Sequence, residues 1–209
     1  MLSFGLKHTK MHISEGVLNP QILIGGAIVS TLIVTYALKK LKNEEIPLVA
    51  VFSALFFLAS FIHIPVGPAS VHLILNGIIG AILGIRAFIA IGIALLLQGL
   101  LFGYGGVSTL GINTFNLALP ALIGFVIFYL HVENPMFKKI KFFFVGFLPV
   151  TVSALMLSLT LAFNGEALIP AAKVAFFANM PVMFIEGFIT LFALLFLEKV
   201  YPSIFKEIK

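Results

Sequence analysis

The sequence contains no cysteine and no aspartate, and only 10% of its 209 residues are charged. A chain without cysteine has no disulfide, no thiolate nucleophile and no Cys-ligated zinc or iron–sulfur site. The pattern G-x-x-x-x-G-K-[ST], whose backbone cradles nucleotide phosphates, is also missing. Thirteen basic residues and a net charge of +5 are too few for a surface that reads nucleic-acid phosphates. The chain is therefore neither a P-loop ATPase nor a nucleic-acid-binding module.

Apolar residues, by contrast, make up 61% of the chain, and the mean hydropathy is +1.17. Soluble domains contain about 45–50% apolar and about 25% charged residues, so this composition is that of a membrane protein. A helix needs roughly 17–25 apolar residues to cross a bilayer. Seven apolar runs, uncharged except for Glu186 in the last, approach that length: 22–38, 48–62, 71–85, 87–103, 117–130, 142–163 and 174–197. We predict an all-α membrane protein that forms one compact bundle of about seven transmembrane helices.

The basic residues indicate which way the bundle is inserted, because cytoplasmic loops of membrane proteins are enriched in lysine and arginine. With the N-terminus outside, ten basic residues fall on the cytoplasmic side and only Lys7, Lys10 and Lys173 fall outside. We therefore predict an outer N-terminus and a cytoplasmic C-terminus. This orientation gathers the histidines His12, His63 and His72 on the outer face.

His72 is the first candidate metal ligand, because it follows the tight turn 67–70 and opens the third apolar run. An ionisable group that enters a membrane is costly unless it has a partner, which makes it a functional candidate. His63 ends the second run beside Pro65 and is the next suspect. The alternative for both residues is a structural role, which for His72 is to cap its helix.

His12 is the second candidate, because it directly follows Met11. If Met11 is the first residue, three nitrogens can close two chelate rings around one metal ion: the α-amino nitrogen of Met11, the amide nitrogen of His12 and the imidazole of His12. The imidazole of His72 would complete a set of four nitrogen ligands. Such a planar nitrogen set suits Ni(II) or Cu(II) and disfavours Mg²⁺ and Ca²⁺. We therefore expect residues 1–10 to be an extension, either a misassigned start or a removed segment, before one transmembrane domain over 11–209.

Two further features are expected around the ligands. The segment 99–111 has five glycines in thirteen residues, which permits close backbone approach and positive φ angles. We expect this segment to form a lid or a layer of residues that orients the ligands, with a flexible connector as the alternative. The residues expected to take part are Gly105, Gly106, Ser108, Thr109, Asn113 and Asn116.

Glu186 lies inside the last apolar run, where it must pair, accept hydrogen bonds or take a proton. It either supports the site or pairs with neighbouring helices.

Four blocks together carry a family resemblance: Met11-His12-Ile13-x-Glu15-Gly16-x-Leu18, the region 70–73 around His72, the block 105–111 followed by Asn113 and Phe115-Asn116, and the stretch 181–187. They resemble the CbiM/NikM family, the substrate-binding membrane subunits of energy-coupling-factor transporters for cobalt and nickel. The resemblance covers residues 11–197. It implies a seven-helix subunit whose N-terminal segment enters the bundle, with the Met11 amine, His12 and His72 as metal ligands.

The resemblance also implies partners and a location. Such subunits work with a transmembrane coupling subunit, cytoplasmic ATPase subunits and often a small accessory membrane protein, in the cytoplasmic (inner) membrane of a prokaryote. The chain would be the capture subunit, not an enzyme, of an ATP-driven importer with Co²⁺ or Ni²⁺ as transported substrate and no cofactor. If the substrate is cobalt, the imported ion would be used in the synthesis of cobalamin. Ligand type alone favours nickel over cobalt, whereas the glycine-rich block resembles the cobalt branch.

The sequence departs from the family pattern at two positions, and two rival functions share some of its features. Ser14 stands where the family commonly has proline, and Asn179 stands where it often has histidine. A stand-alone metal permease would need polar residues along several spans. The spans contain mainly Glu186, Asn76 and Gln98, which argues against a permease. An intramembrane metalloenzyme is the weaker rival, since no H-E-x-x-H pattern is present.

Overall fold

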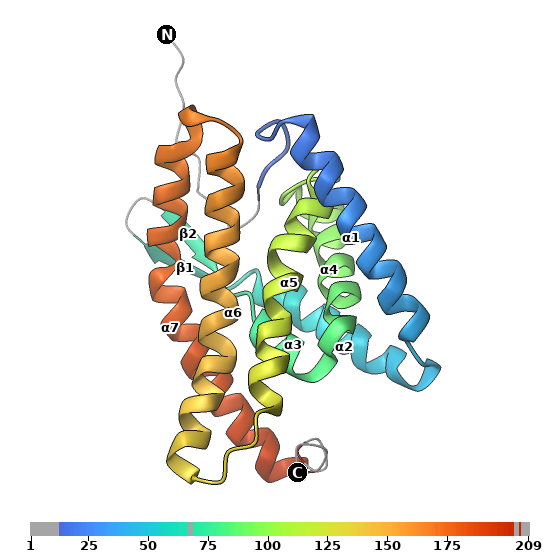
Figure 1. The fold of residues 1–209 in the computed structure, drawn as a ribbon, viewed down its shortest axis with the longest axis vertical. Coiled ribbons are helices and arrows are strands. Elements are labelled where there is room, and N and C mark those ends of the chain that lie inside the picture. Colours follow the sequence, from blue (N-terminus) through green and yellow to red (C-terminus); the bar gives the residue numbers. More distant parts are fainter. Residues whose placement is uncertain (1–12, 67–68, 203–204, 206–209) are drawn as a thin grey trace.

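The structure is a computed structural model that describes residues 13–66, 69–202 and 205 (Figure 1). The chain is mainly helical and contains one short hairpin. The elements, in order, are α1 (Pro20–Lys40), η1 (Asn43–Glu45), α2 (Ile46–Ala59), β1 (His63–Val66), β2 (Ala69–His72), α3 (Asn76–Leu83), η2 (Gly84–Arg86), α4 (Ala87–Phe102), α5 (Leu110–Tyr129), α6 (Pro135–Phe163), η3 (Glu166–Leu168) and α7 (Ile169–Val200).

Five helical segments within the described residues are long and apolar enough to cross a membrane: Pro20–Lys40, Asn76–Phe102, Leu110–Tyr129, Pro135–Phe163 and Glu166–Val200. The prediction of a helical membrane protein is thereby confirmed. The second expected span is shorter than a bilayer requires, because α2 has 14 residues. The third, α3, has 8 residues and joins α4 through η2 into one long segment.

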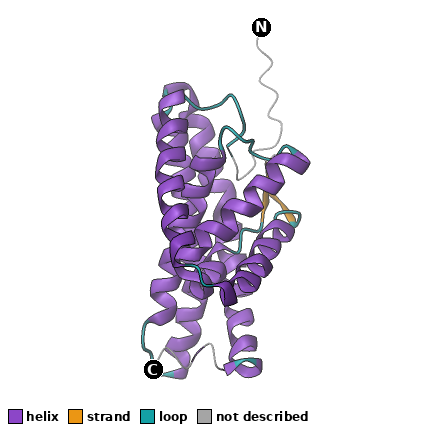
Figure 2. Cartoon of the chain, turned by 90° about the vertical axis from the view of Figure 1, so that its right-hand side faces the viewer, coloured by secondary structure: helices purple, strands orange, loops and turns teal. Residues whose placement is uncertain are grey.

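The expectation that His72 opens a helix is wrong. Residues 63–66 and 69–72 pair as an antiparallel hairpin, with His63 opposite His72. The next helix begins only at Asn76, since Leu75 has the left-handed conformation (φ 56°, ψ 16°), which a right-handed helix cannot continue. Among the described residues this hairpin is the only β structure, and it lies at the edge of the helices (Figure 2).

α5 lies at the centre of the bundle and packs against α1, α3, α4 and α6, while α6 and α7 run side by side along the long axis (Figure 1). Small residues allow the closest crossing. A Cβ atom on Gly80 of α3 would overlap the backbone carbonyl of Ala121 on α5. Membrane helices rely on such close contacts, because lipid removes the hydrophobic drive between them. Glycine is therefore required where α3 crosses α5.

Candidate metal centre

His72 is a buried residue at the end of β2, with 4% of its surface exposed. Its Nδ1 atom lies 2.8 Å from the carbonyl oxygen of Leu73, and since a carbonyl only accepts, Nδ1 donates. Nε2 is then the ring nitrogen that carries the lone pair, the arrangement usual for a metal-binding imidazole. His63 lies opposite on β1, with the two ring centroids 6.1 Å apart. The hairpin therefore brings two of the five histidines together.

Glu186 of α7 fixes the chain directly after His72. Its carboxyl group is completely buried and accepts the N–H of Ile74 at 2.5 Å and the N–H of Leu75 at 2.9 and 3.0 Å. These two N–H groups precede the first turn of α3, where an acceptor from the protein is needed. Glu186 thus stabilises the non-helical link 73–75 between β2 and α3. The sequence predicted that this residue needs a partner but not which one.

Asn113 of α5 holds the backbone of Ile13, the residue that follows His12. The amide oxygen of Asn113 accepts the N–H of Ile13 at 3.1 Å, and the amide nitrogen donates to the carbonyl of Ile13 at 3.1 Å. The same nitrogen lies 3.2 Å from Oγ1 of Thr109. Asn113, Thr109 and Ile13 are all buried. Both hydrogen-bonding ends of one side chain are therefore used to place the N-terminal segment.

The glycine-rich loop forms a seat for Glu15. The N–H of Glu15 donates to the carbonyl of Gly105 at 3.0 Å, and the N–H of Ser108 donates to Oε1 of Glu15 at 3.2 Å. Gly106 has φ +126°, and a Cβ atom there would overlap the Glu15 side chain. Thr109 closes the loop by donating from Oγ1 to the carbonyl of Gly106 at 3.2 Å. The loop thus contacts residue 15 directly, as a support for the N-terminal segment requires.

A polar cavity of about 400 Å³ opens beside this seat, lined by Ser14, Glu15, Gly99, Gly103, Gly105, Gly106 and Val107. The cavity borders the first described residues of the chain. A second contact to the same segment was not foreseen from the sequence: Asn164 donates to the carbonyl of Val17 at 2.8 Å and accepts the N–H of Asn19. The sequence showed only an outer turn at Asn164. Its partners lie 145 and 147 residues away, which no local pattern indicates.

The structure places the remaining candidates as follows. Met11 and His12 lie outside the described residues. Asn116 donates to Thr160 of α6 at 3.2 Å, and this hydrogen bond links α5 to α6. Asn179 is buried and donates to the carbonyl of Ala175 at 2.7 Å, within its own helix. Within the described part of the chain, no group of three or more His, Cys, Asp or Glu side chains surrounds a common point.

Comparison with known proteins gives one consistent result. Residues 12–204 match the family model CbiM, described as the cobalt uptake substrate-specific transmembrane region. A metal transport protein of Haemophilus influenzae is 36% identical over 198 residues, which is 93% of this chain and 96% of that protein. The cobalt transport protein CbiM of Lachnoclostridium phytofermentans is 31% identical over 94% of this chain and 86% of its own length.

Solved structures agree with this result. The crystal structure of a transition metal transporter has a TM-score of 0.76 and 27% identity to this chain, covering 90% of it and 93% of that protein. A truncated transition metal transporter gives a TM-score of 0.75 at 25% identity. The resemblance inferred from four short blocks therefore extends over nearly the whole fold.

Proposed function

The chain belongs to the CbiM family of cobalt uptake transmembrane proteins, and on that basis we propose that it is the substrate-capture subunit of an energy-coupling-factor importer. Its relatives are metal transport proteins and not enzymes. The proposed substrate is a divalent cobalt or nickel ion, which would supply cobalamin synthesis if it is cobalt.

The metal site that we propose has four nitrogen donors. These are the α-amine of Met11, provided that it is the first residue, the amide and imidazole nitrogens of His12, and the Nε2 atom of His72. The observation that supports it most directly is the pair of hydrogen bonds between Asn113 and Ile13. They hold the backbone immediately after His12, and contacts that orient a ligand in this way strengthen metal binding.

The residues around the ligands would act by positioning. Glu186 holds the link that follows His72, and Gly105, Gly106, Ser108 and Thr109 hold Glu15. Removing groups that orient ligands in this way typically lowers metal affinity by about 10–100-fold. His63 would then be a neighbour of the site that takes no part in the first coordination sphere, since it is exposed and its Nδ1 contacts the carbonyl of Phe61.

The proposed orientation and partners follow from charge and from the missing nucleotide motif. The N-terminus would face outward in the inner membrane of a prokaryote, and about seven helices, including the short α2 and α3, would form the membrane domain. ATP hydrolysis would come from cytoplasmic ATPases through a transmembrane coupling subunit. A small accessory membrane protein would join them, as in many transporters that the family resemblance implies. A stand-alone permease is the second candidate. It would need polar residues along several spans, and two of those present, Glu186 and Asn76, already form hydrogen bonds with neighbouring protein groups.

Two experiments test the proposal. The first measures Co²⁺ and Ni²⁺ binding by the purified chain that starts at Met11. His72→Ala should abolish tight binding, whereas His131→Ala, an exposed histidine that pairs with Glu133, should leave it unchanged. The second measures uptake of radioactive cobalt by cells with and without the coupling subunit and ATPases. Uptake that needs those subunits supports an energy-coupling-factor importer, and uptake without them would favour the stand-alone permease.

A further inference from the structure

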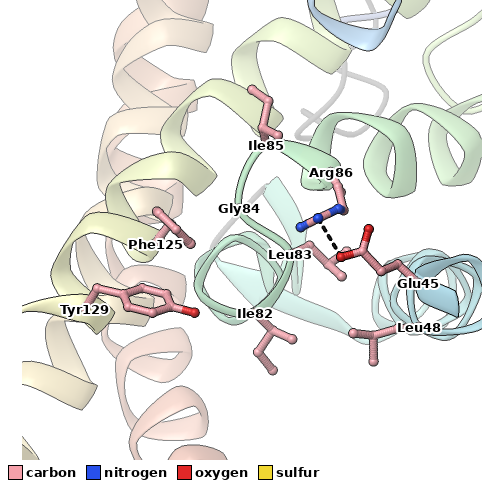
Figure 3. Close-up of a pocket in the computed structure, with 9 residues that line it drawn as sticks. All are labelled: Glu45, Leu48, Ile82, Leu83, Gly84, Ile85, Arg86, Phe125 and Tyr129. Atoms are coloured by element: carbon pink, nitrogen blue, oxygen red, sulfur yellow. Dashed lines mark ion pairs between the residues drawn. The ribbon is translucent and has the colours of Figure 1, made fainter. Parts of the chain in front are cut away.

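A second polar site lies at the other end of α3 and α4 from the candidate metal centre. It is a cavity of about 440 Å³ where the turn before α2 meets the link between α3 and α4. Figure 3 shows Arg86 and Glu45 pointing toward each other, with Phe125 and Tyr129 of α5 on the opposite side. Nothing in the proposed metal capture uses this cavity.

The cavity contains one cation and one anion. Arg86 is the single arginine of the sequence, and its Nη2 atom lies 2.5 Å from Oε1 of Glu45. The side chains are 28% and 25% exposed, so the pair is partly shielded from water yet open to a ligand. Oε2 of Glu45 also accepts the N–H of Lys42 at 3.0 Å, which fixes the carboxylate.

Arg86 has hydrogen-bonding capacity left over. Its Nε atom is buried and has no hydrogen-bond partner among the described residues. A guanidinium group offers five donors in a rigid fork, and this fork matches the oxygens of a phosphate group. A buried donor without a partner is costly, so an oxygen-rich ligand that reaches Nε would stabilise the site.

The rest of the wall is apolar and continues onto the outer surface of the bundle. Leu48 of α2 and Phe125 of α5 line the cavity and are themselves exposed. Val51 and Val126, their neighbours on the same helices, are 63% and 60% exposed. In a membrane protein such surfaces meet acyl chains. The nearby turn carries Lys39, Lys40 and Lys42, residues typical of the headgroup level.

We propose that this cavity binds a zwitterionic aminophospholipid. Its phosphate would contact the Arg86 guanidinium, its primary ammonium group would contact the Glu45 carboxylate, and an acyl chain would lie along Leu48 and Phe125. An anionic lipid satisfies only the arginine and is repelled by the glutamate. A choline headgroup carries no N–H donor for the carboxylate. The inference does not depend on the proposed metal site.

The test measures lipid binding by native mass spectrometry of the delipidated, full-length protein in detergent. The probes are palmitoyl-oleoyl phosphatidylethanolamine, phosphatidylglycerol and phosphatidylcholine, each added alone, and inorganic phosphate added as a competitor. The variants are Arg86→Gln and Glu45→Gln. Lys139→Gln is the control, because Lys139 is an exposed cation at the same end of the bundle. The melting temperature of each variant checks the fold.

We expect the unmodified protein to prefer phosphatidylethanolamine, and Arg86→Gln to weaken that binding about tenfold, as the loss of a charge-assisted contact implies. Glu45→Gln should reverse the preference toward phosphatidylglycerol, and Lys139→Gln should change nothing. If Arg86→Gln does not fold, the reversal in Glu45→Gln decides alone. Equal binding of all three lipids, an unchanged preference in Glu45→Gln, or displacement of the lipid by inorganic phosphate would overturn the proposal.

Discussion

Asn113 forms hydrogen bonds with both the N–H and the carbonyl of Ile13, at 3.1 Å each and across 100 residues of sequence. This contact joins the start of the described chain to the middle of the bundle through α5. Ile13 follows His12, so the hydrogen bonds determine where the proposed ligand's own backbone can lie. We therefore expect metal affinity to depend on a side chain that does not itself touch the metal.

Asn113→Ala should weaken metal binding at least tenfold, since two hydrogen bonds worth about 1 kcal/mol each are lost. The dissociation constant for Co²⁺, measured by calorimetry on the chain that starts at Met11, gives the answer. Asn116→Ala is the matched control, because Asn116 lies on the same helix and its side chain forms hydrogen bonds with Thr160 of α6. Equal losses of affinity in both variants would contradict the assigned role of Asn113.

Gly106→Ala should also weaken metal binding, because the new methyl group would displace Glu15 from its seat and the φ of +126° disfavours alanine. Gly103→Ala separates the two effects. Gly103 has φ +64°, but a Cβ atom there meets nothing within 4 Å. We expect Gly103→Ala to lower the melting temperature and leave affinity unchanged, whereas Gly106→Ala lowers both. An unchanged affinity in Gly106→Ala would show that the seat of Glu15 has no influence on the metal.

Glu186→Ala should reduce both stability and metal affinity. It leaves the buried N–H groups of Ile74 and Leu75 without their acceptor, at a cost of about 1–3 kcal/mol for each group. Glu186→Gln keeps one oxygen that can accept both bonds and should retain most of the affinity. Thermal unfolding and Co²⁺ titration of both variants test this, with Glu166→Ala as an exposed control. Wild-type affinity in a folded Glu186→Ala variant would contradict the positioning role.

Metal affinity should fall as the pH is lowered from 8 to 5.5. The proposed amine and imidazole ligands bind metal only when deprotonated, and their reference pKa values are about 7.7–8.0 and about 6.5. Protons therefore compete increasingly with the metal as the pH falls through that window. Removing one imidazole with His72→Ala should make the dependence of the residual affinity on pH less steep. Calorimetric titrations at several pH values measure the slope, and an affinity independent of pH would rule out nitrogen ligands.

The sequence predicted most of the helices, because apolar runs of 14–24 residues leave few other solutions in a bilayer. The prediction failed where an apolar run contains a change of backbone conformation. Residues 71–85 read as one span, but His72 is the end of a strand and Leu75 takes a left-handed conformation. A hydropathy pattern carries no information about the strand pairing that draws residues 71 and 72 out of the helix.

The residues of the candidate site were found from composition, but their contacts were not. Glu186 stood out as a carboxyl group in an apolar run, while its partners at Ile74 and Leu75 lie 112 and 111 residues away. Asn113 and Asn116 looked equivalent in the glycine-rich block, and the fold separates them. One side chain faces the N-terminal segment and the other faces α6. Only the packing of α5 between its neighbours makes that distinction.

Native mass spectrometry after exposure to equal Co²⁺ and Ni²⁺ tests the central claim most directly, because it reports the N-terminus and the bound metal together. Two forms are compared, one that starts at Met1 and one that starts at Met11. If the α-amine of Met11 is a ligand, we expect one tightly bound ion on the form that starts at Met11 and none on the longer form. A longer form that carries one ion just as tightly would contradict the α-amine as a ligand and leave the site to side chains alone.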